Sequence, residues 1–168
     1  MAGTALAELL IRREQLRAAG RRLVLTNGVF DLLHVGHVQY LEQARALGDC
    51  LFIALNSDES VRRLKGPSRP IVGQEDRATV LAALRWVNAV TIFDQSTAEA
   101  VVTELRPDVY VKGADYAGAD GTPDLQRLPE ARIALSYGAD VHLIRYQPGH
   151  STSALIARII SSHQATAE

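Results

Sequence analysis

The sequence predicts an α/β fold: a single doubly wound, Rossmann-like parallel sheet of about five strands, with helices on both faces. Short apolar runs alternate along the chain with stretches of helical periodicity. Most of the runs are apolar throughout, which is typical of strands buried on both faces of a parallel sheet. The predicted strands are residues 23–25, 50–55, 87–93, 109–111 and 141–144.

Helices are predicted between these strands from the spacing of apolar residues and from residues that start or end helices. Gly20 and Gly48 each follow a periodic stretch and are expected to end it. Ser96 and Glu99 have the spacing of a capping box. The predicted helices are residues 4–19, 37–47, 58–64, 74–84, 96–105, 128–137 and 151–160, and a frayed tail, 161–168, follows the last of them.

Composition indicates one globular domain. The 168 residues are 47% hydrophobic and 22% charged, and they contain no internal repeat or linker. We therefore expect residues 1–168 to form a single domain with an N-terminal helical segment, 1–20. The net charge of −1 gives no reason to expect nucleic acid or a membrane as a partner, and no apolar run has the length of a membrane span. The only cysteine, Cys50, favours a reducing cytoplasm.

One stretch, residues 26–37, organises the rest of the chain. A strand, an Asn-Gly turn and the start of a helix follow one another closely there, which is the arrangement of a nucleotide-phosphate site. His34 and His37 stand at the helix start and add hydrogen-bond donors for an anion. Gly36 between them lets a nucleotide approach the backbone closely.

The alternative interpretations of the two histidines are a zinc pair or a structural pair. Zinc needs a third and usually a fourth ligand of matching type, and no cluster of cysteine and histidine follows. The electrostatic interpretation fits nucleotidyl transfer, in which a phosphate oxygen attacks the α-phosphorus of a nucleoside triphosphate and pyrophosphate leaves. That reaction needs stabilisation of spreading negative charge and no nucleophile from the protein.

Residues 26–37 resemble the signature of the cytidylyltransferase-like nucleotidyltransferases, in which His-x-Gly-His follows the first strand. The wording Thr-Asn-Gly-x-Phe-Asp-x-Leu-His is similar to that of the heptose 1-phosphate adenylyltransferases of ADP-heptose synthesis. The resemblance covers about residues 22–160 and weakens over 117–137. It implies transfer of AMP from ATP to a sugar 1-phosphate, with D-glycero-D-manno-heptose 1-phosphate as the expected acceptor.

The resemblance also carries expectations about cofactors and partners. Mg²⁺ is expected to accompany the nucleotide, without a dedicated set of protein ligands. A homodimer is expected from the resemblance alone. The bifunctional members of the family carry a sugar-kinase domain in addition, so a separate sugar kinase is the expected partner in the pathway.

Polar residues follow three of the predicted strands, where a doubly wound sheet places its ligand. Thr26 and Asn27 follow the first strand, Asn56 follows the second, and Lys112 begins a polar run after the fourth. We expect these clusters to converge on one edge of the sheet. The run from Lys112 resembles the family's Lys-Gly-Gly-Asp-Tyr, with Ala114 as a departure.

Three further segments match family patterns, and they contain cations or hydroxyl groups. Residues 63–70 resemble Arg-Leu-Lys-Gly-x-x-Arg-Pro, which makes Lys65 and Arg69 candidates for phosphate binding, with solvated surface charges as the alternative. Arg77 matches an arginine that contacts the triphosphate, and the alternative is a surface ion pair on its helix. The Ser-Thr-Ser run from Ser151 to Ser153 caps the last helix, and a capped helix start also suits phosphates.

The resemblance assigns these residues to three roles. The catalytic residues are His34, His37 and Lys65, and no protein ligands are assigned to a metal. The acceptor is assigned to Asp31, Lys65, Arg69 and Asp115. The nucleotide is assigned to Thr26, Asn27, Gly28, Val29, Phe30, Gly36, His37, Asn56, Arg77, Lys112, Gly113, Ser151, Thr152 and Ser153.

Two other functions share much of this pattern. A cytidylyltransferase acting on glycerol 3-phosphate or a related alcohol phosphate carries the same signature, because the signature is shared across the superfamily. The choice of base depends on loop backbone contacts. A regulatory module that binds nucleotide without turnover belongs to a different class. The intact set of His34, His37 and Lys65 argues against such a module.

Overall fold

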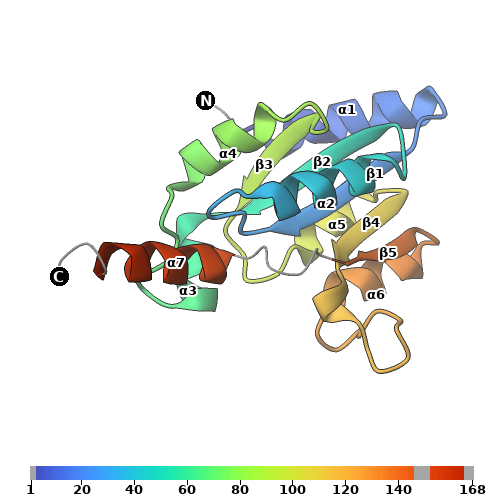
Figure 1. Cartoon of the computed structure of the whole chain (residues 1–168). Coiled ribbons are helices and arrows are strands. Elements are labelled where there is room, and N and C mark those ends of the chain that lie inside the picture. Colours follow the sequence, from blue (N-terminus) through green and yellow to red (C-terminus); the bar gives the residue numbers. More distant parts are fainter. Residues whose placement is uncertain (1–2, 146–151, 165–168) are drawn as a thin grey trace.

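The computed structural model describes residues 3–145 and 152–164 and has a five-stranded sheet at its centre (Figure 1). The strands lie in the order β3-β2-β1-β4-β5. Each neighbouring pair is parallel, which confirms the predicted doubly wound α/β fold. The strands are β1 Leu23–Gly28, β2 Cys50–Asn56, β3 Ala89–Phe93, β4 Val109–Gly113 and β5 Asp140–Ile144.

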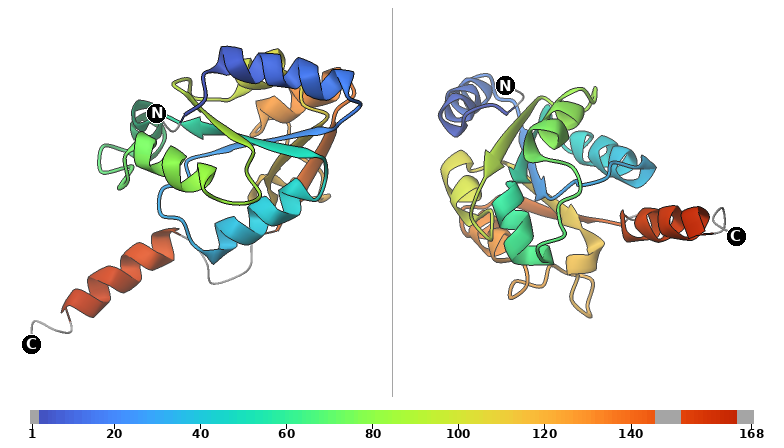
Figure 2. Two further views of the ribbon diagram at one scale, coloured as in Figure 1. Left: turned by 90° about the horizontal axis from the view of Figure 1, so that it is seen from above. Right: turned by 90° about the vertical axis from the view of Figure 1, so that its left-hand side faces the viewer.

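Helices cover both faces of the sheet (Figure 2). Leu23 and Leu25 of β1 pack in one core with α1, α5 and α6, and Val24 between them packs in a second core with α2 and α4. The described helices are α1 Leu6–Ala18, α2 Val35–Arg45, α3 Asp58–Lys65, α4 Gln74–Ala82, α5 Glu99–Leu105, the 3-10 turn η1 Ala114–Tyr116, α6 Pro129–Ser136 and α7 Thr152–Gln164.

Helix α2 begins at Val35, two residues before the predicted start at His37. His34 is its N-cap residue, and the His34 carbonyl accepts hydrogen bonds from the backbone N–H of His37 at 2.9 Å and of Val38 at 3.3 Å. Both histidines therefore belong to the first turn of α2, where the helix dipole is positive.

The predicted role of Gly48 as the end of this helix is wrong. Helix α2 ends at Arg45, and Ala46 is its C-cap residue. A β-carbon at Gly48 would lie 2.7 Å from Cγ2 of Val24 and 2.9 Å from the carbonyl oxygen of Arg22. Glycine is needed there because the chain passes against the start of β1. Gly20, by contrast, follows α1 with a positive φ of 65°, as predicted.

The capping box predicted at Ser96 and Glu99 is not formed. Helix α5 begins after Ala98, whose backbone N–H donates to Oε1 of Glu130 at 2.8 Å. Glu99 accepts a hydrogen bond from the Thr97 hydroxyl at 2.8 Å instead. A carboxylate from α6, distant in the sequence, thus bonds to the backbone at the start of α5, close to where a local cap was predicted.

The C-terminal helix differs from the others in its surroundings. Helix α7 projects away from the sheet (Figure 2), and its Ile159 and Ile160 are largely exposed. It runs through Gln164, beyond the predicted end at residue 160, and residues 165–168 of the predicted tail lie outside the described residues. In the described part of the chain, no helix has the length and apolar character needed to cross a membrane.

A partly buried ion pair ties α1 to the loop between α5 and β4. The Arg13 guanidinium donates to both carboxylate oxygens of Asp108 at 2.9 Å and to the carbonyl oxygens of Leu105 and Arg106. The Leu23 backbone N–H also donates to Asp108, at 2.7 Å. Burial alone would raise the pKa of Asp108, but these hydrogen bonds outweigh it and lower the pKa.

We expect Arg13→Met to lower the free energy of unfolding by about 2–4 kcal/mol, because it leaves two carbonyls without this donor and leaves the Asp108 carboxylate with the Leu23 amide alone. Urea unfolding followed by circular dichroism measures the change. Arg12→Met is the matched control, since Arg12 is exposed and forms a surface ion pair with Glu8 on its own helix. The control is expected to change stability by less than about 0.5 kcal/mol. Equal effects of the two substitutions would contradict the assigned role of Arg13.

Candidate active site

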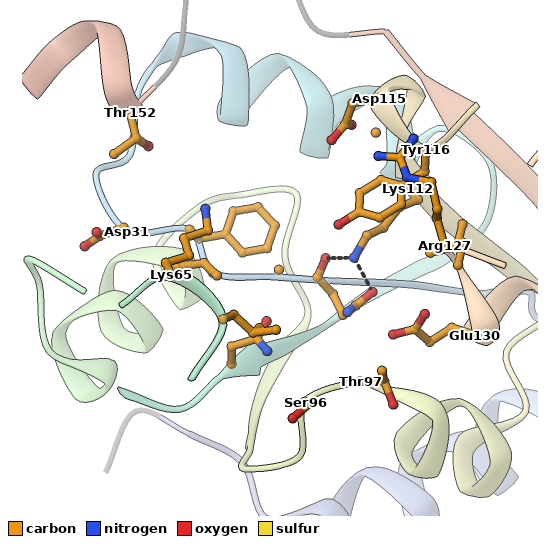
Figure 3. A pocket seen from close by; sticks show the side chains of 18 of the residues that line it. Asp31, Lys65, Ser96, Thr97, Lys112, Asp115, Tyr116, Arg127, Glu130 and Thr152 are labelled. Atoms are coloured by element: carbon orange, nitrogen blue, oxygen red, sulfur yellow. Dashed lines mark hydrogen bonds between the residues drawn. The ribbon is translucent and has the colours of Figure 1, made fainter. Parts of the chain in front are cut away.

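A cavity of about 480 Å³ lies at the carboxyl edge of the sheet (Figure 3). The structure brings the polar clusters after β1, β2 and β4 together there, as expected for a doubly wound sheet. Loops and helices from both faces complete the wall. The predicted site residues that line the cavity are Asn27, Gly28, Val29, Phe30, Asp31, His37, Asn56, Lys65, Arg69, Lys112, Gly113, Asp115 and Thr152.

The floor of the cavity is a buried hydrogen-bond network between β1 and β4. The Lys112 ammonium donates to the backbone oxygen of Asn27 at 3.1 Å and to its side-chain Oδ1 at 2.9 Å. The Tyr110 hydroxyl donates to the same Oδ1 at 2.6 Å. Asn27 and Lys112 are each less than 10% exposed, so these bonds are shielded from solvent.

Both lysines of the chain, Lys65 and Lys112, lie at this site and line the cavity. Burial lowers the pKa of Lys112 to about 8, although Glu130 and Asp115 act in the opposite direction. Lys112 therefore remains mostly protonated at neutral pH. Lys65 is exposed at the end of α3 and places a second ammonium on the opposite side of the cavity (Figure 3).

The two histidines of α2 are stacked. Their ring centroids lie 3.9 Å apart with an interplanar angle of 30°, and the Phe30 ring lies 5.4 Å from that of His37. Of the two histidines, His37 lines the cavity and His34 does not. Burial, followed by the positive charges of His34 and Lys65, lowers the pKa of His37 to about 4. His37 is therefore neutral at physiological pH, and it meets an anion as a hydrogen-bond donor.

The backbone before the histidines takes an uncommon path. Phe30 has a φ of 46°, in the left-handed region that few non-glycine residues adopt. A β-carbon at Gly28 would lie 3.0 Å from Cε2 of Phe30. Glycine at 28 therefore lets the Phe30 ring fold back beside His37, and this turn sets the position of the His37 ring.

Asp31 lies at the cavity, but its carboxylate is already occupied. Arg69 donates to Oδ2 at 2.6 Å, and the backbone N–H groups of Ile71 and Val72 each donate to Oδ1 at 2.9 Å. Burial opposes ionisation, yet the amides of Val72 and Ile71 and the Arg69 guanidinium together lower the pKa of Asp31. Asp31 anchors the loop that follows α3, so the predicted contact with acceptor hydroxyls has to compete with these donors.

Arg77 does not line the cavity, contrary to what a contact with the triphosphate requires. Its side chain is fully buried and donates to the carbonyl oxygens of Val72 at 2.9 Å and Val29 at 2.6 Å, and to Oδ1 of Asp58 at 2.8 Å. The surface ion pair considered as its alternative is also wrong, because Arg77 is only 1% exposed. Arg77 braces the loop after β1 against α3.

The remaining predicted residues are distributed as follows. Thr26 is buried, and its hydroxyl shares a hydrogen bond of 2.7 Å with the Tyr40 hydroxyl. Gly36 is buried in α2, and Ser153 is exposed, and neither lines the cavity. Thr152 lines it from the start of α7, whereas Ser151 lies outside the described residues.

Five polar residues of the wall were missed by sequence reasoning. Glu130 is 4% exposed. It was missed because an acidic residue in the first turn of a helix is common and needs no functional explanation. The Tyr116 ring lies 5.1 Å from Lys112 Nζ and 5.6 Å from Arg127 Cζ, and its place directly after the Lys-Gly-Ala-Asp run was the available signal. Ser96 and Thr97 complete the set, from the loop after β3.

No cage for a metal ion is apparent. Among residues 3–145 and 152–164, no group of three or more histidine, cysteine, aspartate or glutamate side chains is arranged to hold one. The Asp31 carboxylate is taken by Arg69 and two amides, and one oxygen of Glu130 by Ala98. A divalent ion that keeps water and substrate phosphates as ligands is compatible with such a donor set.

Fold and site together have the organisation of a nucleotidyltransferase. The family model described as Cytidylyltransferase-like matches residues 25–158, which span β1 to α7. The chain therefore belongs to the cytidylyltransferase-like family.

Individual relatives agree with this assignment. "Bifunctional protein HldE" of Streptomyces coelicolor is 50% identical over 86% of the chain, and that of Geobacter sulfurreducens is 46% identical over 88%. The chain spans about 30% of the length of these relatives. A solved "lipopolysaccharide core biosynthesis protein" from Thermoplasma volcanium matches 76% of this chain and 98% of its own, with 29% identity and a TM-score of 0.59.

The lowered pKa of His37 predicts a pH dependence of stability. Its pKa is about 4 when folded and 6.5 ordinarily, so the unfolded chain binds the proton more readily. The free energy of unfolding should fall as the pH decreases from 6.5 to 4, by at most about 3 kcal/mol from this residue. Asp31 and Asp108, whose pKa values lie below 3.8, lose their contributions only at lower pH.

Urea unfolding at intervals between pH 7 and pH 4 measures this dependence. His37→Gln should flatten it, because glutamine does not titrate. His142→Gln, at an exposed position on β5, is the matched control and should retain the wild-type slope. Identical slopes for wild type and His37→Gln would show that His37 does not titrate in this range.

Proposed function

We propose that this protein transfers AMP from ATP to the phosphate of a sugar 1-phosphate, D-glycero-D-manno-heptose 1-phosphate, and releases pyrophosphate. The observation that carries the proposal is the convergence of His37, Lys65 and Lys112 on one cavity at the start of α2. Neutral donors and ammonium groups around a helix start suit the charge of a transferring phosphoryl group. The relatives named HldE and the lipopolysaccharide core protein support the sugar-phosphate acceptor.

The reaction needs no covalent intermediate with the protein. An oxygen of the acceptor phosphate forms a bond to the α-phosphorus of ATP, and the bond from that phosphorus to the bridging oxygen of pyrophosphate breaks. Negative charge spreads over the α-phosphate oxygens and the leaving group. His37 donates a hydrogen bond to this charge, the first-turn amides of α2 add their dipole, and Lys65 and Lys112 hold the phosphates.

The stacked arrangement suggests different tasks for the two histidines. His37 faces the substrate, and His34 supports the His37 ring from behind and helps to keep it neutral. A neutral imidazole can enter a buried site without the desolvation cost of a charge, and it still donates one N–H.

Other residues complete the proposed site. The backbone of Gly28, Val29 and Gly113 lets the nucleotide lie close to the sheet edge, and Thr152, together with Ser151 and Ser153, closes on the triphosphate. Asp115 is exposed at the rim and orients hydroxyl groups. Asp31 acts through the loop that it anchors and places Arg69 beside the acceptor. Mg²⁺ bound to the nucleotide phosphates would neutralise part of their charge.

Some expectations extend the proposal beyond the site. Residues 1–168 as a single nucleotidyltransferase domain, a homodimer, a separate sugar kinase and a cytoplasmic location remain predictions. A cytidylyltransferase acting on glycerol 3-phosphate is the second candidate, because the matching family is described as Cytidylyltransferase-like. The test of substrates therefore includes CTP and glycerol 3-phosphate.

Substrate identity is tested by pyrophosphate release with Mg²⁺, crossing ATP and CTP against heptose 1-phosphate and glycerol 3-phosphate. We expect turnover only with ATP and the heptose. Turnover only with CTP and glycerol 3-phosphate would retain the mechanism and replace both substrates. Stabilisation against heat by nucleotide without any product would identify a binding module.

The electrostatic role of the histidines is tested by substitution. We expect His37→Ala to lower kcat by about a hundredfold or more, since one oxyanion donor typically contributes that much. His34→Ala should also lower kcat, through the position of the His37 ring. Thermal unfolding establishes that both variants are folded, and His142→Ala serves as the control. Folded variants with full activity would refute the assignment.

A further inference from the structure

The cavity has two sides that are separated by the plane of the sheet. His37 comes from α2, on one face, and Glu130 comes from α6, on the other face. In Figure 3, Ser96, Thr97 and Glu130 lie together on the side of α5 and α6, away from Lys65 and Thr152. Because the start of α2 attracts the triphosphate, the side of α5 and α6 is left for the second substrate.

Glu130 is a buried carboxylate on this side of the cavity. It is 4% exposed, and its Oε1 accepts a hydrogen bond of 2.8 Å from the buried Ala98 amide. No described residue donates a hydrogen bond to its second oxygen, Oε2, and this oxygen is not one of the buried unpaired atoms, so it is reached from the cavity that Glu130 lines. An accessible carboxylate oxygen without a partner is suited to accept a hydrogen bond from a ligand in the cavity.

Ser96 stands near Glu130 on a fixed loop. The Ser60 hydroxyl donates to the Gln95 carbonyl at 2.8 Å, and the Thr97 hydroxyl donates to Glu99 at 2.8 Å, so both neighbours of Ser96 are held. The Ser96 hydroxyl itself has no hydrogen-bond partner among the described residues. It can both donate to and accept from a ligand in the cavity.

The Glu130 carboxylate favours a hydroxyl group over a phosphate as its direct partner. A buried carboxylate repels phosphate oxygens, whereas hydroxyl groups donate readily to it. Lys112 and Arg127 lie on the same side of the cavity as Glu130, and Lys65 lies across from them (Figure 3). An acceptor with a phosphate at one end and several hydroxyl groups at the other matches a cavity that offers both cations and a carboxylate.

We propose that Glu130 and Ser96 form a subsite for the hydroxyl groups of the acceptor, and that Glu130 determines specificity for a polyhydroxylated sugar phosphate. This inference rests on the proposed function, because it divides that cavity between nucleotide and acceptor. It assigns a task to the segment 117–137, over which the family resemblance is weakest.

The test measures acceptor binding separately from turnover. Heptose 1-phosphate is titrated calorimetrically into the full chain saturated with Mg²⁺ and α,β-methylene ATP, which cannot transfer its nucleotide. We expect Glu130→Gln to raise the Kd of the acceptor about tenfold or more, since the amide retains the volume and one oxygen for Ala98 but loses the charge. Ser96→Ala should raise it about threefold, the effect of one neutral hydrogen bond.

Matched controls separate a subsite from a general loss of structure. Glu104→Gln makes the same chemical change at an exposed position on α5 and should leave the Kd of the acceptor unchanged. The Kd of the ATP analogue should change less than twofold in Glu130→Gln. Thermal unfolding of each variant establishes that it is folded under the conditions of the titration.

The outcomes distinguish this inference from the proposed function. Acceptor binding that is lost in Glu130→Gln, without pyrophosphate release by the wild type, would support the subsite and refute the transfer reaction. Pyrophosphate release with an unchanged acceptor Kd in Glu130→Gln would support the reaction and overturn the subsite. A weaker Kd for the ATP analogue alone would assign Glu130 to the nucleotide, and absence of acceptor binding by the wild type would also overturn the subsite.

Discussion

The contact between Lys112 and Asn27 is the constraint on which the site depends. A buried ammonium is unfavourable unless its protons are bonded, and Asn27 supplies two oxygens to Lys112, at 2.9 and 3.1 Å. The Tyr110 hydroxyl bonds to the same side chain and fixes its amide. These contacts hold the carboxyl ends of β1 and β4 together, and the loops that carry the other site residues leave from that junction.

Asp31 and Arg77 hold two loops in place beside this junction, and these loops help to form the cavity wall. Asp31 holds the loop after α3 through Arg69 and two backbone amides, and Arg77 holds the loop after β1 through the Val29 carbonyl. The partners are separated by 38 to 48 residues in the sequence. Each anchor buries a charge and satisfies it with several hydrogen bonds, so the loops gain a defined position without regular secondary structure.

The sequence predicted those features that depend on local pattern. Apolar runs identified the five strands, of which β1 to β4 are buried along nearly their whole length and β5 is a largely exposed edge strand. Polar residues at the strand ends located the cavity, where a doubly wound sheet places its ligand. Arg77 and Glu130 were misjudged or missed because their partners lie in other elements. An arginine early in a helix and a glutamate at a helix start both resemble solvated charges until the fold brings Val29 and Ala98 to them.

The Lys112 ammonium, which stabilises the floor through Asn27, also gives the cavity a positive charge. Lys112 uses two of its three N–H groups on Asn27, and its ring neighbour Tyr116 covers one flank. Burial lowers its pKa to about 8, so an approaching phosphate favours the protonated form that the floor already needs. Substitution of Asn27 or Lys112 therefore changes stability and binding together. Lys65, exposed on α3 and free of such a network, is the position at which phosphate binding can be separated from folding.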